Sequence, residues 1–256
     1  MRRFPVLLTL WLMACPLAAT AQVAGKFPPD SATNLQVIPK GTPVMQVIGQ
    51  MRNITGALGV RCPFCHVGTE GKPLSEFDFA SDDKPTKLVA RQMMRMVEEI
   101  NRRLDTLPMV HEMPAHDTPH VEVTCRTCHR GVQEPIPLST LIAQATVEAG
   151  ADSGIKSYLA LRARYYGRDA FDFGEGSLNV AAFRVAREQK YDAALALLAL
   201  NEQEFPGSSG MYVFRGNILL MQGDTTGAAG AYREAVKRDS TNGEARGRLK
   251  DIGQTP

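Results

Sequence analysis

The sequence predicts an all-α protein with two helical parts behind an amino-terminal export signal. Two observations favour helices: apolar residues recur at helical spacing in two stretches before residue 108, and a self-similarity with a 34-residue period begins near residue 178. The chain has 256 residues, 44% of them hydrophobic, which is enough to bury a sizeable core. We therefore expect a signal peptide at residues 1–21, a small first domain over residues 22–138 and a second domain over residues 139–256.

The charge balance argues against a nucleic-acid-binding protein. The chain holds 29 Lys and Arg against 27 Asp and Glu, and its formal net charge is +2. Two of the arginines lie within the first three residues, so the rest of the chain is neutral overall. A strongly basic surface of the kind that neutralises phosphates is not expected, and no nucleic-acid partner is predicted.

The amino terminus has the three parts of a secretory signal. Arg2 and Arg3 precede an apolar run over residues 4–12, and small residues at 19–21 form a cleavage site. The run is too short to span a bilayer, and no later stretch reaches 18 consecutive apolar residues. Export predicts a periplasmic location, which is an oxidising compartment. Cys15 is a weaker candidate for lipidation, and membrane contact is expected only if it is acylated.

Four of the five cysteines and two of the five histidines lie in two copies of one short motif. Residues 62–66 read CPFCH and residues 125–129 read CRTCH, and both match C-x-x-C-H, the signature of covalently attached c-type haem. Two thiols one short turn apart add to the two vinyl groups of one porphyrin, and the next histidine binds its iron. Two haem c groups are therefore the predicted cofactors. Their candidate binding residues are Cys62, Cys65, His66, Cys125, Cys128 and His129.

Three other uses of the four cysteines are open. Zinc-binding pairs usually lie ~15 to 20 residues apart, whereas 59 residues separate Cys65 from Cys125. Two disulfides would not require a histidine after each pair. A thioredoxin-like redox motif would require a strand–helix–strand context, and the flanking sequence is typical of helices. Haem attachment explains all six residues and is the leading interpretation.

Each of two predicted helices has methionine on its apolar face. The first has Thr42 as its expected N-cap, Pro43 as its first residue and Gly59 as its end. Its apolar positions are Val44, Val47, Met51, Ile54 and Leu58. The second runs from about Pro85 to Leu107, with apolar positions Val89, Met93, Met96, Val97, Ile100 and Leu104. A thioether is a known sixth haem ligand, but methionine also fills space beside a porphyrin, so spacing leaves both roles open.

Four stretches of the sequence resemble one half of the tetrahaem cytochrome subunit of photosynthetic reaction centres. They are residues 51–66, 79–82, 86–93 and 123–131, and the resemblance covers roughly residues 42–137. In that family a helix runs along each haem, supplies a methionine and leads into the C-x-x-C-H segment. The resemblance implies that Met51 is the sixth ligand of the haem on His66. It likewise implies that Met93 serves the haem on His129, with Met94 and Met96 as neighbouring alternatives.

The sequence also departs from the family pattern. The family has four haems, whereas two attachment motifs are present here. The connection before the second motif is longer and contains His111, His116 and His120. These histidines are solvated loop residues, ligands of a lower-potential bis-histidine haem, or ligands donated to a partner subunit. Loss of half of the domain argues against a role as the immediate donor to a photosynthetic reaction centre.

The second half of the chain predicts helical hairpins. Ala194 and Ala228 are 34 residues apart, as are Leu198 and Tyr232, and this is the period of the tetratricopeptide helix–turn–helix unit. The segment over residues 155–173 is predicted to pack as a further helix or to dock on the haem domain. A tetratricopeptide-like surface binds protein segments. A protein partner on this surface and a packing extension that shields the haems are the two interpretations.

Together these features favour an electron carrier over an enzyme. Haems with His and Met ligands have no open iron position, so their chemistry is one-electron exchange with redox partner proteins. A dihaem peroxidase would need an open iron and nearby acid–base groups, for which His111, Glu112, His116 and Asp117 are candidates. A tethering subunit of a respiratory or photosynthetic electron-transfer complex is a third interpretation. We expect a periplasmic dihaem cytochrome c that carries electrons between a donor and an acceptor.

Overall fold

The structure is a computed structural model, and it describes residues 26–107 and 122–255. Within these ranges the chain contains helices and no named strand, as the all-α prediction requires, and Val67 and Asp78 form an isolated β-bridge. None of the described helices combines the length and the apolar character that a membrane span needs. The predicted export signal, Cys15 and the three histidines between residues 108 and 121 lie outside the described residues, so those expectations stay predictions.

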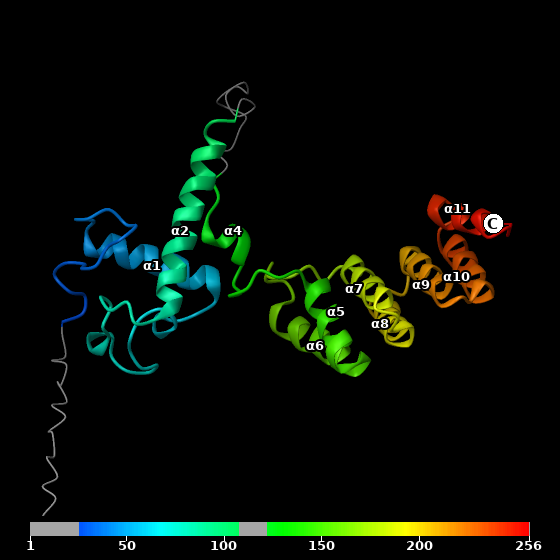
Figure 1. Cartoon of the computed structure of the whole chain (residues 1–256), viewed down its shortest axis with the longest axis horizontal. Coiled ribbons are helices and arrows are strands. Elements are labelled where there is room, and N and C mark those ends of the chain that lie inside the picture. The colour runs from blue at the N-terminus through cyan, green and yellow to red at the C-terminus, as the bar shows by residue number, and fades with distance from the viewer. Residues whose placement is uncertain (1–25, 108–121, 256) are drawn as a thin grey trace, which may run out of the picture. The chain divides into compact units, whose positions relative to one another are not determined.

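The helices fall into two groups along the chain (Figure 1). The first group is α1 (Val44–Leu58), α2 (Pro85–Leu104) and the short α4 (Cys125–His129), with 3₁₀ turns η1 (Cys62–Phe64) and η2 (Leu74–Glu76). The second group is α5 (Leu138–Ala149), α6 (Ala151–Tyr165), α7 (Glu175–Arg187), α8 (Tyr191–Glu204), α9 (Ser209–Gln222), α10 (Thr225–Arg238) and α11 (Gly243–Asp251). The described residues divide into two compact units, residues 26–50 with 62–93 and residues 51–61 with 94–107 and 122–255. Both α1 and α2 contribute to each unit.

Helix α1 begins one residue later than the sequence indicates. The hydroxyl of Thr42 does not cap the helix, because it donates to the carbonyl of Pro39 at 2.7 Å. The carbonyl of Pro43 accepts the first helical N–H groups, so Pro43 precedes α1 rather than opening it. At the other end, Gly59 has φ of +66°, a left-handed conformation that glycine adopts without strain, and it ends α1 as predicted.

Helix α2 ends at Leu104, three residues before the predicted end. The next residues form a turn in which the hydroxyl of Thr106 donates to the carbonyl of Arg103 at 2.8 Å. Pro108 follows in the sequence, and the residue before a proline is disfavoured in the helical conformation. The apolar periodicity continues to Leu107, but this local chemistry stops the helix earlier.

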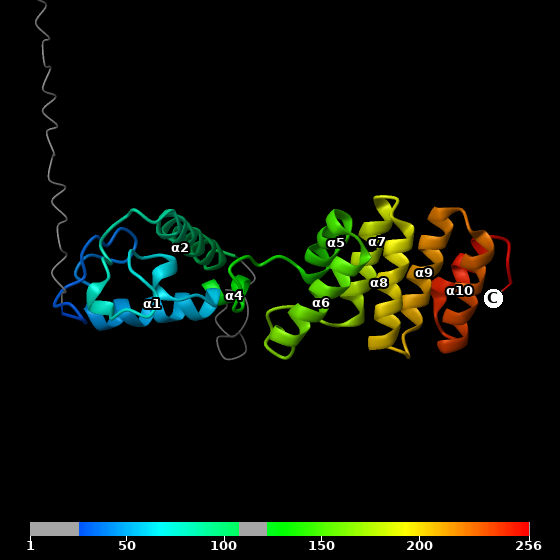
Figure 2. The same ribbon diagram turned by 90° about the horizontal axis from the view of Figure 1, so that it is seen from below.

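Helices α5 to α11 stack as successive antiparallel pairs (Figure 2). Helices α7, α9 and α11 begin at residues 175, 209 and 243, and α8 and α10 begin at residues 191 and 225, so each helix recurs after 34 residues. The predicted hairpins and their period are therefore present, while their assignment to the tetratricopeptide class stays a prediction. Of the two arrangements expected for residues 155–173, the structure has a helix, α6, which packs on α5 and α8.

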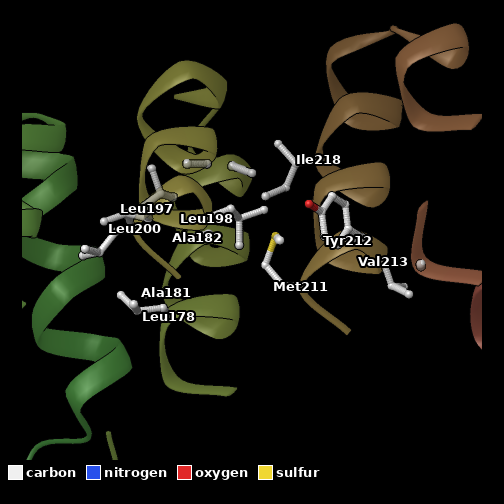
Figure 3. Close-up of a cluster of buried hydrophobic side chains, with 14 of the residues drawn as sticks. Leu178, Ala181, Ala182, Leu197, Leu198, Leu200, Met211, Tyr212, Val213 and Ile218 are labelled. Atoms are coloured by element: carbon white, nitrogen blue, oxygen red, sulfur yellow. The ribbon is translucent and has the colours of Figure 1, made fainter. Parts of the chain in front are cut away.

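The second group of helices shares one continuous apolar core. Figure 3 shows side chains of α7, α8 and α9 converging between the helices. The largest fully buried apolar side chains are Tyr158, Tyr232, Ile142, Leu178, Leu197, Leu198, Met211, Ile218 and Leu249. Small residues allow the paired helices to approach closely: a Cβ on Gly216 of α9 would lie 2.3 Å from the ring of Tyr232 on α10. Dispersion contacts and removal of apolar surface from water hold this part together without a cofactor.

Candidate functional site

The first C-x-x-C-H motif forms a tight turn shortly after α1. The carbonyl of Cys62 accepts the N–H of Cys65 at 3.2 Å and that of His66 at 3.0 Å, which folds the motif into one turn. All three side chains are half-buried. The cysteines of both motifs are free thiols in the structure.

His66 lies in an environment that keeps its imidazole neutral. Its ring meets the ring of Phe79 edge-on, with centroids 5.0 Å apart. Burial, and next the charge of Lys87, lower the pKa of His66 to about 4. Its Nδ1 atom is buried and has no hydrogen-bond partner among the described residues. Neutral imidazole is the form that binds a metal ion, so His66 is suited to be an iron ligand.

Lys87, in the first turns of α2, holds the loop that follows the first motif. Its side chain is almost fully buried, and its Nζ donates to the carbonyls of Phe79 at 2.9 Å, Ala80 at 3.0 Å and Ser81 at 2.7 Å. The same Nζ lies 3.1 Å from a carboxylate oxygen of Asp82. These contacts join two of the stretches on which the family resemblance rests, residues 79–82 and 86–93. They also fix the backbone of Phe79, whose ring packs against His66.

Asp82 completes this arrangement at the surface. Its carboxylate accepts hydrogen bonds from the guanidinium of Arg91 and from the amide of Asn34, each at 2.9 Å. The guanidinium, followed by the amide, holds the pKa of Asp82 well below its ordinary value. The carboxylate therefore stays ionised throughout the neutral range and balances the buried cation of Lys87.

Two further side chains at the start of α2 bind the middle of the first motif. The hydroxyl of Thr86 donates to the carbonyl of Phe64, and the Nζ of Lys84 donates to the carbonyl of Pro63 at 2.9 Å. A tight turn leaves such carbonyls without backbone partners, so these two donors satisfy them. Burial raises the pKa of the Cys65 thiol, and the hydrogen bond from Thr86 partly offsets that effect. The first motif is thus held by α2 as well as by its own turn.

The second motif is itself the short helix α4. The N–H of Thr124, the residue before the helix, donates to the hydroxyl of Thr127 at 2.9 Å, and Arg130 ends the helix in the left-handed conformation with φ of 49°. The Nδ1 of His129 lies 3.0 Å from the carbonyl of Val132. When Nδ1–H donates to this carbonyl, Nε2 is the lone-pair nitrogen. Metal-ligating histidines are commonly oriented in this way.

Backbone contacts fix the second motif at both ends. The N–H of Gly131 donates to the carbonyl of Ala57 near the end of α1, at 2.7 Å. A Cβ on Gly59 would lie 2.2 Å from the carbonyl oxygen of Gly131, so this approach requires glycine. On the other side, the amide of Asn101 on α2 donates to the carbonyl of Val123 and accepts from its N–H, both at 2.8 Å. The motif is therefore anchored to α1 and to α2 by main-chain groups.

The predicted methionine ligands lie on the expected helices. Met51 is half-buried on α1, and on α2 Met94 is half-buried whereas Met93 and Met96 are 43% and 48% exposed. Met51 and His66 belong to different compact units, as do Met93 and His129. The pairing of each methionine with its iron therefore stays a prediction.

The distribution of buried apolar residues shows that this part of the chain fits a haem. Among the described residues before Leu138, the buried apolar side chains are those of Ile38, Ala57 and Val132. The buried side chain of α2 is Lys87. Large apolar side chains here are exposed instead, namely Met45, Leu88, Val89, Met93, Met96 and Leu107. Amphipathic helices normally bury such a stripe, and a porphyrin is a large apolar group that would cover it.

Sequence reasoning missed the residues that position the motifs. Lys87 lies inside a stretch that carries the family resemblance, but no role was expected for it. Asn101 interrupts the apolar pattern of α2 and gave no other signal. Both residues bind backbone groups, whose positions depend on tertiary structure. The family resemblance over residues 86–93 was the one available signal for a role of Lys87. It did not indicate which groups Lys87 binds.

Comparison with known proteins finds one family and several relatives that each match part of the chain. Residues 72–158 match the family described as photosynthetic reaction centre cytochrome C subunit. The chain is 34% identical over 76 residues to cytochrome c-554 of Chloroflexus aurantiacus, which is 30% of this chain and 15% of that protein. It is 32% identical over 93 residues to the photosynthetic reaction center cytochrome c subunit of Thermochromatium tepidum, covering 34% of this chain and 21% of that protein.

The corresponding subunit of Rubrivivax gelatinosus is 31% identical over 93 residues, which is 34% of this chain and 23% of that protein. The chain therefore spans less than a quarter of the length of these relatives. No solved structure matches the chain.

Proposed function

We propose that this chain, a relative of the photosynthetic reaction-centre cytochrome c subunits, is an exported dihaem cytochrome c that carries electrons between redox partner proteins. The proposal rests on the pair of C-x-x-C-H motifs. Both motifs lie in the part of the chain where α1 and α2 have exposed apolar side chains, which a haem would cover. The predicted export signal at residues 1–21 supports a periplasmic location, where haem would be attached to the cysteines of the exported chain.

Each side chain of the motifs has a defined role in this proposal. Cys62 and Cys65 hold one haem and Cys125 and Cys128 hold the other, so that neither haem is lost to solution. His66 and His129 bind the two irons. When bound, haem would supply a one-electron iron couple, and a methionine ligand would raise its potential. Met51 and Met93 are the residues proposed to supply the methionine ligands, and the irons would then exchange electrons with partner proteins rather than bind substrate.

The first test is the visible spectrum of protein exported from a host that matures c-type cytochromes. We expect two covalent haems per chain, a reversible change on reduction and no response to carbon monoxide. Rapid binding of carbon monoxide by one haem would indicate an open iron and favour the peroxidase-like alternative. A chain that carries no haem under these conditions would contradict the proposal. Zinc binding and disulfide bonds would then be the remaining interpretations of the two motifs.

A second prediction concerns the methionine ligands. Replacement of Met51 or Met93 by Ala should open one iron each, so that one of the two haems binds carbon monoxide and its reduction potential falls. Met45→Ala is the control for Met51→Ala, because Met45 is exposed on the same helix, α1. Met94→Ala and Met96→Ala test the two neighbouring alternatives to Met93 on α2. Redox titration with spectroscopy measures both potentials. If Met96→Ala lowers a reduction potential and Met93→Ala does not, Met96 is the ligand instead of Met93.

A tethering role is a second candidate, favoured by the carboxy-terminal hairpins. We propose that α7–α8 and α9–α10 are two tetratricopeptide-like units and that α11 opens a third. The 34-residue recurrence of their helices supports this, as do the buried Ala194 and Ala228 at equivalent positions of α8 and α10. Such arrays bind protein segments. In this proposal they attach the cytochrome to a partner protein, and in the alternative they only shield the haems.

A further inference from the structure

The two motif histidines differ in the surroundings of their Nδ1 atoms. When Nε2 is the iron ligand, Nδ1 is the atom through which neighbouring groups tune the imidazole. The Nδ1 of His129 lies 3.0 Å from the carbonyl of Val132, whereas the Nδ1 of His66 is buried and has no hydrogen-bond partner among the described residues. A hydrogen bond donated from Nδ1 makes imidazole a stronger electron donor, which favours ferric iron. The second motif therefore stabilises ferric iron in a way that the first does not.

Lys87 binds the backbone carbonyl that adjoins His66. This carbonyl belongs to Phe79, whose ring packs against His66, and it accepts a hydrogen bond from the Nζ of Lys87 at 2.9 Å. The same Nζ donates to the carbonyls of Ala80 and Ser81, so the ammonium is held in one place. The side chain of Lys87 is almost fully buried, and water and salt screen a buried charge weakly. Lys87 thus occupies an acceptor beside His66 and places a cation close to it.

Asp82 offsets the charge of Lys87 only in part, because it serves two cations. Its carboxylate lies 3.1 Å from the Nζ of Lys87 and 2.9 Å from the guanidinium of Arg91. After burial, the charge of Lys87 is the largest cause of the lowered pKa of His66. Arg91 acts in the same direction, and the carboxylate of Asp78 opposes both more weakly. The field at this imidazole is therefore positive, and positive charge beside an iron ligand favours ferrous over ferric iron.

We propose that Lys87 makes the haem on His66 the one with the higher reduction potential, so that an electron entering at either iron collects there. The inference rests on the proposed function, because it requires a haem at each motif. Both irons have His and Met as their proposed ligands, so ligand type alone predicts similar potentials. The groups around the two histidines then set the order. One electron passes from the iron on His129, which is oxidised, to the iron on His66, which is reduced, and no bond forms or breaks.

The test is a redox titration of the full-length holoprotein, followed by its visible spectrum. The parent protein should titrate as two one-electron components of different potential. K87Q removes the charge and the ammonium that binds the carbonyl of Phe79. It should lower the higher potential by about tenfold in the ferric–ferrous equilibrium, which is about 59 mV for one electron, and the lower potential by less. K87R keeps the charge and should keep the higher potential close to that of the parent protein.

D82N is a second variant whose effect has the opposite sign. It removes a carboxylate that accepts hydrogen bonds from Arg91 and Asn34, so the cations beside His66 lose their counter-charge. The higher potential should therefore rise. The carboxylate of Asp82 lies at the surface, so this variant decides the question if K87Q does not fold.

R126Q is the matched control, because Arg126 is a cation within the second motif whose side chain is exposed. Water and salt screen an exposed charge, so R126Q should move either potential less than K87Q does. Three results would overturn the inference: one common potential for both haems, shifts of K87Q and D82N confined to the lower potential, or equal shifts in K87Q and R126Q. A parent protein without haem would refute the proposed function instead, so the two failures are distinguishable.

Discussion

Without haem, the protein should unfold before residue 138 and remain folded after it. The change is replacement of Cys62, Cys65, Cys125 and Cys128 by Ala, which prevents attachment at both motifs. Amide hydrogen exchange should then be fast over residues 26–107 and 122–137, and slow over α5 to α11. The expected contrast is large, because exchange protection in a stable core exceeds that of an unfolded segment by many orders of magnitude.

The physical reason lies in where apolar side chains are buried. Ordering one residue costs about 1–2 kcal/mol of backbone entropy. Ile38, Ala57 and Val132, the buried apolar residues described before Leu138, cannot offset that cost for the whole segment. The haems would supply the missing apolar contacts, whereas α5 to α11 have a continuous core of their own.

Hydrogen exchange is measured by mass spectrometry on peptides from residues before and after 138, with the haem-loaded parent protein as the reference. Peptides from α8 serve as an internal control, since this helix buries Ala194, Leu197, Leu198 and Leu200 in the second core. Equal protection of both parts in the haem-free variant would show that the amino-terminal part folds without its cofactor. The uncovered apolar faces of α1 and α2 would then need another explanation.

Local chemistry explains which parts of this fold are predictable from sequence. The limits of α1 and the turns of the hairpins depend on neighbouring residues, such as Gly59 with its positive φ and Gly223 with its own. Helical periodicity and the 34-residue recurrence can also be recognised in a single sequence, since both are patterns of side-chain type. The start of α1 was misplaced by one residue, because a local turn places the carbonyl of Pro39 beside Thr42, whose hydroxyl donates to it instead of capping the helix.

The positioning residues were not predictable for a different reason. Lys87 and Asn101 bind main-chain groups, which nearly every residue type possesses, so no partner type can be predicted from the sequence. A lysine early in a helix is ordinarily solvent-exposed, and nothing in the composition of α2 marks Lys87 as buried. The two C-x-x-C-H motifs were visible because their chemistry requires particular side chains at fixed spacing.

Lys87→Met should strongly destabilise the holoprotein. Methionine preserves an unbranched apolar stem, but it removes the ammonium that donates to the carbonyls of Phe79, Ala80 and Ser81. Loss of the donor costs ~1–3 kcal/mol for each acceptor left without a partner, and Lys87 serves three carbonyls, so we expect the free energy of unfolding to fall by about 3 kcal/mol or more. Urea unfolding of the holoprotein, followed by haem absorbance and circular dichroism, measures it.

Lys84→Met is the matched control for this substitution. Its Nζ donates to a single carbonyl, that of Pro63, so its loss should cost about 1 kcal/mol. Because Lys87 fixes the backbone of Phe79, whose ring packs on His66, Lys87→Met should also alter the spectrum of the haem on His66 and leave that of the other haem unchanged. Equal destabilisation by the two variants would mean that the loop is held by its own backbone. A large loss of stability with an unaltered spectrum would mean that Lys87 stabilises the loop without fixing the position of Phe79. The spectrum depends on Phe79, because its ring contacts His66, the proposed iron ligand.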